Sequence, residues 1–223
     1  MIKMQKIMNA EVAEILGAFT GDGWIENRGG AMYICGHSVD DKAYYDNYLG
    51  PLVSKWFTSV NPKKFEYWHV YGISIYKKDI IAKMLDIGFQ KGKKCYTAMI
   101  PDWIKNGDIS LQIAFLRGLF DTDGCVWFEK TKVNKILQPR LSIISCSEKL
   151  IKECGVILAR LEVKCEIRRR LNISQTRNNN PYSELRIRTK DNLKKWFEII
   201  GTNNKKHRRK YEQISKSKTQ IFL

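Results

Sequence analysis

The chain has 223 residues, 43% of them hydrophobic, so it is long enough to bury one large core or two smaller ones. Its 39 Lys and Arg residues against 23 Asp and Glu residues give a formal net charge of +16, which indicates a nucleic-acid partner. The sequence has no apolar stretch of about 18 residues, no lipidation motif and no secretory or transit pattern at its N-terminus, which argues against a membrane or secreted protein. We expect an intracellular protein, in the cytoplasm of a prokaryote or in an organelle matrix.

The 6 cysteines and 3 histidines are scattered along the chain. They form no CxxC pair, no HxxxH pair and no mixed Cys/His cluster, so neither a zinc site nor a histidine metal site is expected. We interpret the cysteines as reduced residues of the core, because free cysteine is among the residue types that are most often buried.

The first half of the chain opens with a predicted helix that ends in ILGAFTGDG, residues 15–23. Asn9 can cap this helix, its apolar residues recur with helical spacing, and Gly23 can end it as a C′ glycine. The elements predicted after it are two strands within 24–38, a helical segment within 41–57 that Pro51 kinks or restarts, strands within 63–76, and a helix within 77–88.

The second half repeats this order after a linker at 101–110. Ser110 can cap a helix that ends in LRGLFDTDG, residues 116–124, and Gly124 can stop it. This helix is apolar on nearly every side, so we expect it to be buried. The elements predicted after it are strands within 125–147, a helix within 147–161, strands within 163–174 and 182–190, a helix within 189–201, and a basic helical run at 205–218.

Each half therefore reads αββαββα, and the two nine-residue segments are offset by 101 positions throughout. We predict an α+β fold in which this unit is duplicated about a pseudo-two-fold axis. The N-terminal subdomain spans 1–104, and the C-terminal subdomain spans 105–223 and carries the basic C-terminal helix.

Each of the two segments places a carboxylate at the C-terminal end of a helix. Asp22 and Asp123 there oppose the helix dipole, at a cost of about 0.3–1 kcal/mol each. The small residues of both segments would let the two helices pack closely, which brings the carboxylates together. A divalent cation such as Mg²⁺ would offset both penalties. In a basic protein, this pattern favours metal-dependent hydrolysis of phosphodiesters.

The two segments resemble the nine-residue motif of the LAGLIDADG homing endonuclease family, in its monomeric form with two motifs. The glycine in third place, the acid in eighth place and the closing glycine are present in both, and the resemblance extends over about residues 9–210. It implies two antiparallel β-sheet saddles that pack on a central pair of motif helices and straddle DNA. It also implies Mg²⁺-dependent cleavage of both strands across the minor groove, leaving 3′ overhangs.

The resemblance further assigns roles to residues of this chain. Asp22 and Asp123 become the catalytic, metal-binding acids, and the carbonyls of Gly21 and Thr122 become additional metal ligands. It implies two or three divalent ions, with Mn²⁺ able to replace Mg²⁺ and Ca²⁺ binding without turnover. A basic residue is expected beside each acid, and the candidates are Lys94 or Lys93 and Lys206 or Lys205.

One position of the motif differs between the halves. The sixth residue is Thr20 in the first motif and Asp121 in the second. This position is not a metal ligand in the family, so cleavage is still expected. The difference is where we would look for asymmetry between the two cuts.

Side chains that alternate along the predicted strands are candidates for contacts with DNA. Arg can read guanine and Glu can accept from cytosine, so one polar strand face suits the major groove. The candidate residues are Glu26, Arg28, Trp127, Glu129, Lys164, Arg168, Arg170, Arg186 and Arg188. The basic C-terminal run is expected to bind phosphates instead.

The leading hypothesis from the sequence is a monomeric endonuclease that is intron-encoded or free-standing and acts on a long, pseudo-palindromic or asymmetric site in double-stranded DNA. The alternative is an RNA maturase, or a non-cleaving nucleic-acid-binding protein on the same scaffold. Both acids are present, which favours the enzyme, although a maturase can also retain them.

Overall fold

The computed structural model describes residues 7–130, 137–171 and 181–216. The strands are β1 (Gly23–Ile25), β2 (Met32–His37), β3 (Lys63–Phe65), β4 (Val70–Ile75), β5 (Gly124–Lys130), β6 (Leu137–Ser145), β7 (Glu166–Leu171) and β8 (Pro181–Ile187). The longer helices are α2 (Ala10–Asp22), α4 (Gly50–Trp56), α5 (Lys78–Asp86), α7 (Ile109–Asp123), α8 (Glu148–Arg160), α9 (Lys190–Ile199) and α10 (Lys205–Lys216). The shorter ones are α3 (Lys42–Tyr44), the π-helical turn η1 (Tyr45–Leu49), the 3₁₀ turn η2 (Glu66–Trp68) and α6 (Asp102–Lys105).

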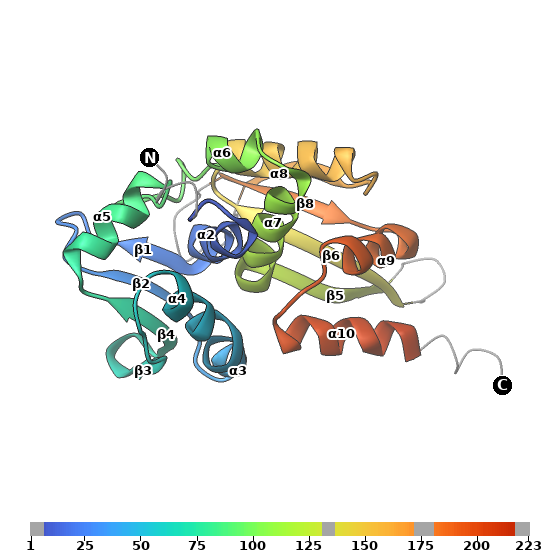
Figure 1. Cartoon of the computed structure of the whole chain (residues 1–223). Coiled ribbons are helices and arrows are strands. Elements are labelled where there is room, and N and C mark those ends of the chain that lie inside the picture. Colours follow the sequence, from blue (N-terminus) through green and yellow to red (C-terminus); the bar gives the residue numbers. More distant parts are fainter. Residues whose placement is uncertain (1–6, 131–136, 172–180, 217–223) are drawn as a thin grey trace.

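The eight strands form two antiparallel sheets with the same topology, one in each half of the chain (Figure 1). Their orders are β1-β2-β4-β3 and β5-β6-β8-β7. The registers match as well, because Gly23 pairs with Ile34 in the first sheet as Gly124 pairs with Ile143 in the second. The predicted α+β class and the internal duplication are therefore confirmed.

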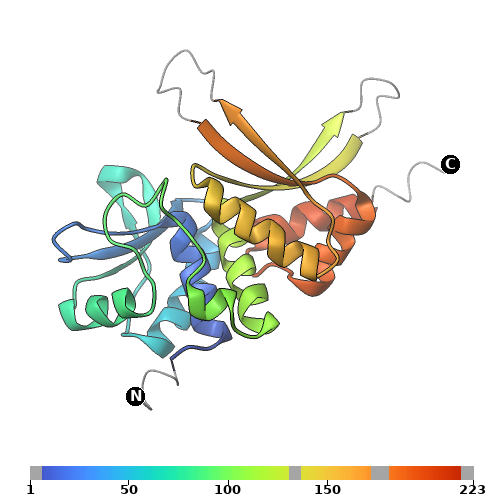
Figure 2. The same ribbon diagram turned by 90° about the horizontal axis from the view of Figure 1, so that it is seen from above.

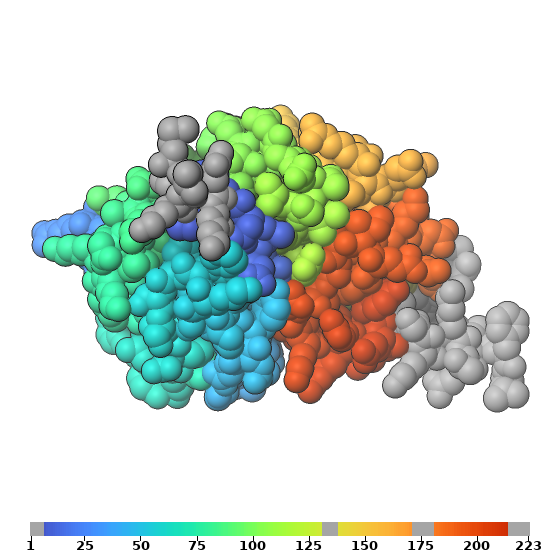
Figure 3. Space-filling view, in the orientation of Figure 1, coloured from blue at the N-terminus to red at the C-terminus, as the bar shows by residue number. Residues whose placement is uncertain are grey.

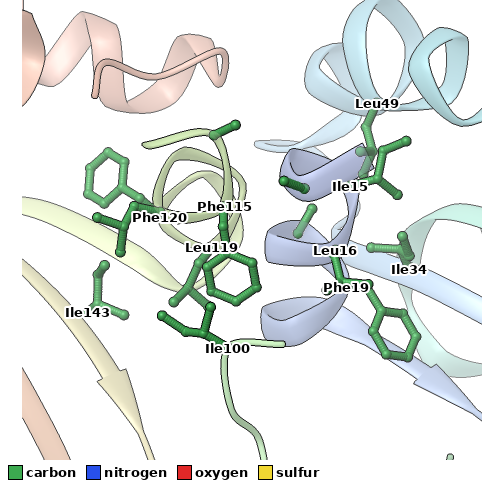
Figure 4. Packing of buried hydrophobic residues seen from close by; sticks show 14 of the residues in the cluster. Ile15, Leu16, Phe19, Ile34, Leu49, Ile100, Phe115, Leu119, Phe120 and Ile143 are labelled. Carbon is green, nitrogen blue, oxygen red and sulfur yellow. The ribbon is translucent and has the colours of Figure 1, made fainter. Parts of the chain in front are cut away.

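The motif helices α2 and α7 lie side by side between the two sheets (Figures 1 and 4). Two glycines permit this contact, since a Cβ on Gly17 would lie 2.1 Å from the carbonyl oxygen of Phe115. A Cβ on Gly118 would likewise lie 2.0 Å from the carbonyl oxygen of Glu14. The helix backbones therefore touch, as the small residues of the two motifs predicted.

Buried side chains of both motif helices belong to one continuous core. Leu16 and Phe19 of α2, and Phe115 and Leu119 of α7, are at most 1% exposed (Figure 4). The core extends from these helices to the inner face of each sheet, where Ile34 and Ile143 are fully buried. Helix α7 is thus buried, as its apolar sequence predicted.

The start of α2 is as predicted, and the start of α7 is not. The side chain of Asn9 accepts a hydrogen bond from the N–H of Val12, 3.1 Å away, and so caps α2. Helix α7 begins at Ile109 with Asp108 in the N-cap position, so the prediction that Ser110 is the cap was wrong. Asp108 precedes it with an extended backbone and its carbonyl already accepts a hydrogen bond from the N–H of Leu111.

The glycines that end the motif helices differ from the prediction too. Gly23 and Gly124 have extended backbones, with φ of −96° and −79°, so neither is a left-handed C′ glycine. Each helix instead runs directly into a strand. The absence of a Cβ matters because that atom would lie 2.2 Å from the ring of Phe19 at one site and 2.1 Å from the ring of Phe120 at the other.

Two connecting segments contain more structure than the sequence indicated. The predicted helical segment around Pro51 is divided into α3, the turn η1 and α4, with Pro51 in the first turn of α4. The predicted linker contains the short helix α6. The predicted strand segments 125–147 and 163–174 lie partly outside the described residues, at 131–136 and 172–174.

All six cysteines are free. Cys35 and Cys154 are buried, but Cys125 is exposed, so the expectation of core cysteines was wrong for that residue.

In the described part of the chain, none of the helices combines the length and the apolar character that a membrane span requires.

Seen from above, helices α8 and α9 lie on one side of the second sheet, and its two hairpins project away on the other side (Figure 2). Below the motif helices in the view of Figure 3, the chain next to α10 meets the α3–α4 segment of the first half. The two halves therefore touch through the motif helices and through this second contact.

Candidate active site and nucleic-acid interface

The candidate active site lies where the C-terminal ends of α2 and α7 meet. Asp22 and Asp123 are the last residues of these helices. A Cβ on Gly21 would lie 2.2 Å from Oγ1 of Thr122 and 3.1 Å from Cγ of Asp123, so the two helix ends are in contact. The predicted pair of acids is brought together by the fold.

This environment raises the pKa of both acids. Burial is the main cause for Asp22, followed by the charges of Asp123 and Asp41, and its pKa rises to about 7. Burial raises the pKa of Asp123 to about 6. Two carboxylates are therefore held in a poorly solvated place and repel one another, as expected of a site that a cation occupies.

Of the predicted lysine pairs, Lys94 and Lys206 lie beside the acids, whereas Lys93 and Lys205 are exposed. The Nζ of Lys94 donates to the carbonyl of Thr20 and, over 2.9 Å, to the carbonyl of Gly21. Both ammonium groups lower the pKa of both acids and so partly oppose the effect of burial. Burial in turn lowers the pKa of Lys94.

Asp41 is a third carboxylate at this site, and sequence reasoning missed it. It lies just before α3, is 4% exposed, and its Oδ1 is 2.6 Å from Nζ of Lys206. Its other partners are the side chain of Asn204, which donates over 2.8 Å, and the N–H of His37, which donates over 2.9 Å. No local pattern marks this residue, because its partners Asn204 and Lys206 come from the other half of the chain.

Asp121 occupies the motif position that Thr20 occupies in the first half, and its side chain is bonded to the segment before α10. It is fully buried and accepts hydrogen bonds from the hydroxyl of Thr202 and from the N–H of Asn203, 2.9 Å away. Thr20 merely donates to the carbonyl of Leu16 in its own helix. Asp121 therefore anchors the segment before α10 to the end of α7, and Thr20 makes no equivalent contact in the first half.

A further buried carboxylate, Glu14, joins the halves at the middle of the motif helices. It accepts from the hydroxyl of Tyr48 over 2.8 Å, from the side chain of Asn203 over 2.7 Å and from Arg117 over 3.2 Å. Burial raises the pKa of Glu14, and Arg117 opposes this rise. Because these partners come from both halves, the network specifies how the halves align.

The donor atoms at the helix ends suit Mg²⁺, which keeps part of its water shell, better than a metal that takes all of its ligands from protein side chains. Among the described residues, no group of three or more His, Cys, Asp and Glu is arranged to hold a metal. The site instead presents the carboxylates of Asp22 and Asp123 with the nearby carbonyls of Gly21 and Thr122. Mg²⁺ takes few protein ligands and keeps several waters, and its charge would offset the repulsion of the two acids.

The predicted contacts with DNA fall into two groups. Glu26 and Arg28 lie in the exposed turn after β1 rather than on a strand, because β1 ends at Ile25. Lys164 precedes β7 and donates its N–H to Asn192, so it too lies outside the strand on which it was expected. The strand positions predicted for these three residues were therefore wrong.

The remaining predicted residues share one face of the second sheet. Trp127 pairs with Arg140, and Arg186 pairs with both Ser142 and Glu166, so strands β5 to β8 all contribute to this face. Leu141, Ile143, Leu185 and Ile187 are buried on the opposite face. The predicted members of the polar face are Trp127, Glu129, Arg168, Arg170 and Arg186, with Arg188 directly after β8; Arg140 was missed.

Replacing Asp41 with asparagine is expected to lower the free energy of unfolding by about 3 kcal/mol, because the largely buried Lys206 ammonium loses its charged partner. The exposed neighbour Asp40 provides the matched control, and Asp40→Asn should change stability by less than about 0.5 kcal/mol. Urea unfolding at neutral pH measures both. Equal stability of the two variants would contradict the role assigned to Asp41.

Residues 110–201 match the protein family described as LAGLIDADG-like domain. Over 219 residues the chain is 25% identical to the replicative DNA helicase DnaB of Synechocystis sp.. This match covers 94% of the chain but only 24% of the helicase.

Three solved structures have a similar fold. The first, of mesophilic variants of the homing endonuclease I-DmoI, has a TM-score of 0.57 and 18% identity and covers 87% of this chain and 97% of that one. The second, of I-DmoI in complex with DNA and Mn, has a TM-score of 0.55 and 19% identity over the same shares. The third, of the N-terminal LAGLIDADG domain of DUF199/WhiA, has a TM-score of 0.52 and 15% identity and covers 89% of this chain and 87% of that one.

Proposed function

We propose that this chain, which has the duplicated fold of the LAGLIDADG homing endonucleases, is a site-specific endonuclease that cuts both strands of double-stranded DNA. One observation carries the proposal. Asp22 and Asp123 lie at the touching ends of the motif helices, with pKa values raised to about 7 and about 6. A metal-dependent cleavage site accounts for two mutually repelling acids at the centre of the protein, whereas DNA binding alone does not require them.

The two acids and the adjoining carbonyls of Gly21 and Thr122 would hold the divalent cations. When bound there, Mg²⁺ supplies a water of lowered pKa and stabilises the negative charge that develops on the phosphate. Lys94 and Lys206 contribute positive charge on either side of the acids, and Asp41 holds Lys206 in place through their 2.6 Å ion pair. Because each half supplies one acid and one lysine, each half would serve one DNA strand.

DNA is the proposed partner on grounds of charge and shape. The net charge of +16 favours a polyanion, and the polar face of the second sheet carries several arginines. I-DmoI, whose fold this chain shares, has been crystallised with its DNA in the presence of Mn and of Mg. As the resemblance of its two motifs to the LAGLIDADG family implies, the protein would act as a monomer across the minor groove and leave 3′ overhangs.

Cleavage of a selected DNA duplex tests the proposal. With Mg²⁺ or Mn²⁺ the protein should cut both strands, and with Ca²⁺ it should bind without cutting. Asp22→Asn and Asp123→Asn should each abolish cleavage and leave binding within a few fold, whereas Asp40→Asn should cut normally. If either substitution at the paired acids leaves the rate unchanged, the assignment of the acids is wrong.

Binding should also depend steeply on salt. Each phosphate that a lysine or arginine neutralises lowers the logarithm of the association constant by about 0.9 per tenfold rise in salt. Titration of a labelled duplex at several salt concentrations gives the slope. An affinity that stays constant from low to physiological salt would contradict phosphate binding by this basic chain.

A protein that binds nucleic acid without cutting it, such as an RNA maturase, is the second candidate. Two observations favour it. The carbonyl of Gly21, a proposed metal ligand, already accepts a hydrogen bond from Lys94. The fold also occurs in the N-terminal LAGLIDADG domain of DUF199/WhiA. Specific binding of DNA or RNA without cleavage under any divalent metal would establish this second function.

A further inference from the structure

The two sheets occupy equivalent places in the duplicated fold, yet the outer face of the first is mainly aromatic and that of the second is rich in arginine. The registers define which residues correspond, because Ile34 pairs with Ile73 as Ile143 pairs with Leu185. Counting along each strand from these pairs gives the equivalent positions. The outer face of the sheet is the one whose residues alternate with these buried ones.

At most equivalent positions, the first sheet carries aromatic or small residues where the second sheet carries arginines; the exception is Lys63, which is equivalent to Arg168 and lies over the ring of Phe65. Tyr33 and Ser74 are paired in the first sheet as Ser142 and Arg186 are in the second. The same count sets Ala31 against Arg140, Phe65 against Arg170 and Tyr76 against Arg188. Of the six positions compared, five carry arginine in the second sheet, whereas Lys63 is the one cationic residue among the six in the first sheet.

The outer face of the first sheet is a connected set of rings, here called the aromatic face: Trp24, Tyr33, Phe65, Trp68 and Tyr76. Trp24 stacks on Tyr33 with their centroids 4.5 Å apart, and the edge of Trp68 lies against both rings. The rings of Tyr33 and Tyr76 meet edge to face, with their centroids 6.0 Å apart. Trp68 is 44% exposed and Tyr76 is 57% exposed, so apolar ring surface remains open.

The outer face of the second sheet, here called the arginine face, consists of Arg140, Arg168, Arg170, Arg186 and Arg188. The guanidinium of Arg186 lies over the ring of Trp127 and is 2.9 Å from Glu184. Arg140 is only 5% exposed and is bonded to Glu129 over 2.7 Å, so it supports the face from within. The five arginines are all ion-paired, but they share only three carboxylates, Glu129, Glu166 and Glu184. Because the side chains of Arg168, Arg170 and Arg188 are 39% to 44% exposed, the face keeps donors for a nucleic acid.

We propose that the two sheets recognise chemically different halves of an asymmetric DNA target. The aromatic face would contact the C5 methyl groups of a thymine-rich half-site, and the arginine face would bind a half-site rich in G·C pairs. Arginine is the usual partner of guanine in the major groove, and thymine is the base that presents a methyl group there. This inference rests on the proposed DNA binding and specifies the substrate of that same surface.

The first experiment recovers the preferred target from randomised DNA duplexes. The protein is incubated with the duplexes in EDTA, so that bound DNA stays intact, and the retained sequences are determined. We expect one half-site enriched in thymine and adenine and the other in guanine and cytosine. The Arg186→Ala variant should relax the guanine preference in one half-site only, which identifies the half under the arginine face.

The second experiment removes the methyl groups alone. Replacing thymine by deoxyuridine throughout the half-site under the aromatic face should weaken binding of the unaltered protein by about fourfold for each methyl buried. The same replacement in the other half-site should change binding by less than twofold. Because the protein is unaltered, no effect on folding can produce this result.

A substitution that copies the second sheet into the first gives an independent test. Ser74→Arg places arginine at the position equivalent to Arg186 and should raise guanine enrichment at one position of the thymine-rich half-site. Val156→Ala, on the exposed side of α8, should leave both preferences unchanged.

The outcomes separate this inference from the proposed function. Recovery and cleavage of a target whose two halves have the same base composition, or equal binding of the deoxyuridine duplex, would overturn the inference and leave the endonuclease intact. Failure to retain any duplex DNA would overturn both. Retention of single-stranded RNA in preference to duplex DNA would also overturn it and would assign the aromatic face to unstacked bases.

Discussion

Replacing Asp22 with asparagine is expected to stabilise the metal-free protein at neutral pH by about 2 kcal/mol, although the same change should abolish cleavage. The physical reason is that Asp22 is an acid held where its charge is unfavourable, with its pKa raised to about 7 by burial and by the charges of Asp123 and Asp41. An amide has nearly the same shape but no charge. The gain in the free energy of unfolding is smaller than the full pKa shift of Asp22 implies, because Lys94 and Lys206 lose a favourable interaction with its negative charge.

The gain should depend on pH in a defined direction. The pKa of Asp22 is about 7 in the folded protein and 3.8 as the ordinary value, so between these values the folded state binds more protons than the unfolded state. The contribution of Asp22 to the free energy of unfolding is therefore most favourable at low pH and is lost as the pH rises from about 4 to about 7. The advantage of Asp22→Asn over the unaltered protein should grow over the same interval.

Urea unfolding in EDTA at several pH values from about 4 to about 8 measures this advantage. Asp40→Asn, which replaces an exposed acid in the same half, should show no such dependence. Added Mg²⁺ should stabilise the unaltered protein and act less on the variant, because a ligand that binds only the folded state raises its stability. An Asp22→Asn protein less stable than its parent at pH 7 would contradict the account of the paired acids.

Replacing Gly118 with alanine is expected to destabilise the protein by about 3 kcal/mol or more. In an isolated helix the same change is favourable by about 1 kcal/mol, since alanine forms helices better than glycine. Here the new Cβ would lie 2.0 Å from the carbonyl oxygen of Glu14 and 2.9 Å from the backbone nitrogen of Ala18. Neither backbone atom can move without separating the motif helices.

Thermal and urea unfolding compare this variant with Gly30→Ala. The control alanine would meet only Oε2 of Glu26, at 3.3 Å, at the end of a flexible and exposed side chain. Gly17→Ala should resemble Gly118→Ala, because its Cβ would lie 2.1 Å from the carbonyl oxygen of Phe115. Variants that fold should also cleave poorly, since separation of the helices separates Asp22 from Asp123. A Gly118→Ala protein as stable as its parent would show that the helices can part without cost.

Much of the fold could be predicted from the sequence because the relevant signals are local or repeated. Helical spacing of apolar residues, the cap at Asn9 and two segments in register are sufficient to predict the motif helices and the duplication. The acids at the ends of those helices follow from the same two segments. Alternation along β5 and β8 likewise placed Trp127, Glu129 and Arg186 on one face.

Local pattern also produced the errors. Ser110 is a good cap by residue type, but the helix begins one residue earlier after an extended Asp108. Gly23 and Gly124 read as left-handed caps, yet both are glycine because an aromatic ring of the preceding turn occupies the space of a Cβ. The residues Glu26, Arg28 and Lys164 were assigned to strands whose ends the sequence does not mark.

The duplication, the motif helices and their terminal acids can be inferred from the residues alone, because each of these is encoded within one short segment or in its repeat. Packing of the folded chain, in contrast, is what places Lys94 rather than Lys93 at the site and brings Asp41 to Lys206. Packing also brings the rings of the aromatic face together on the first sheet, at positions where the second sheet mostly carries arginines. Asp41 and Asn204 are 163 residues apart, and a contact over such a separation exists only once the two halves have packed.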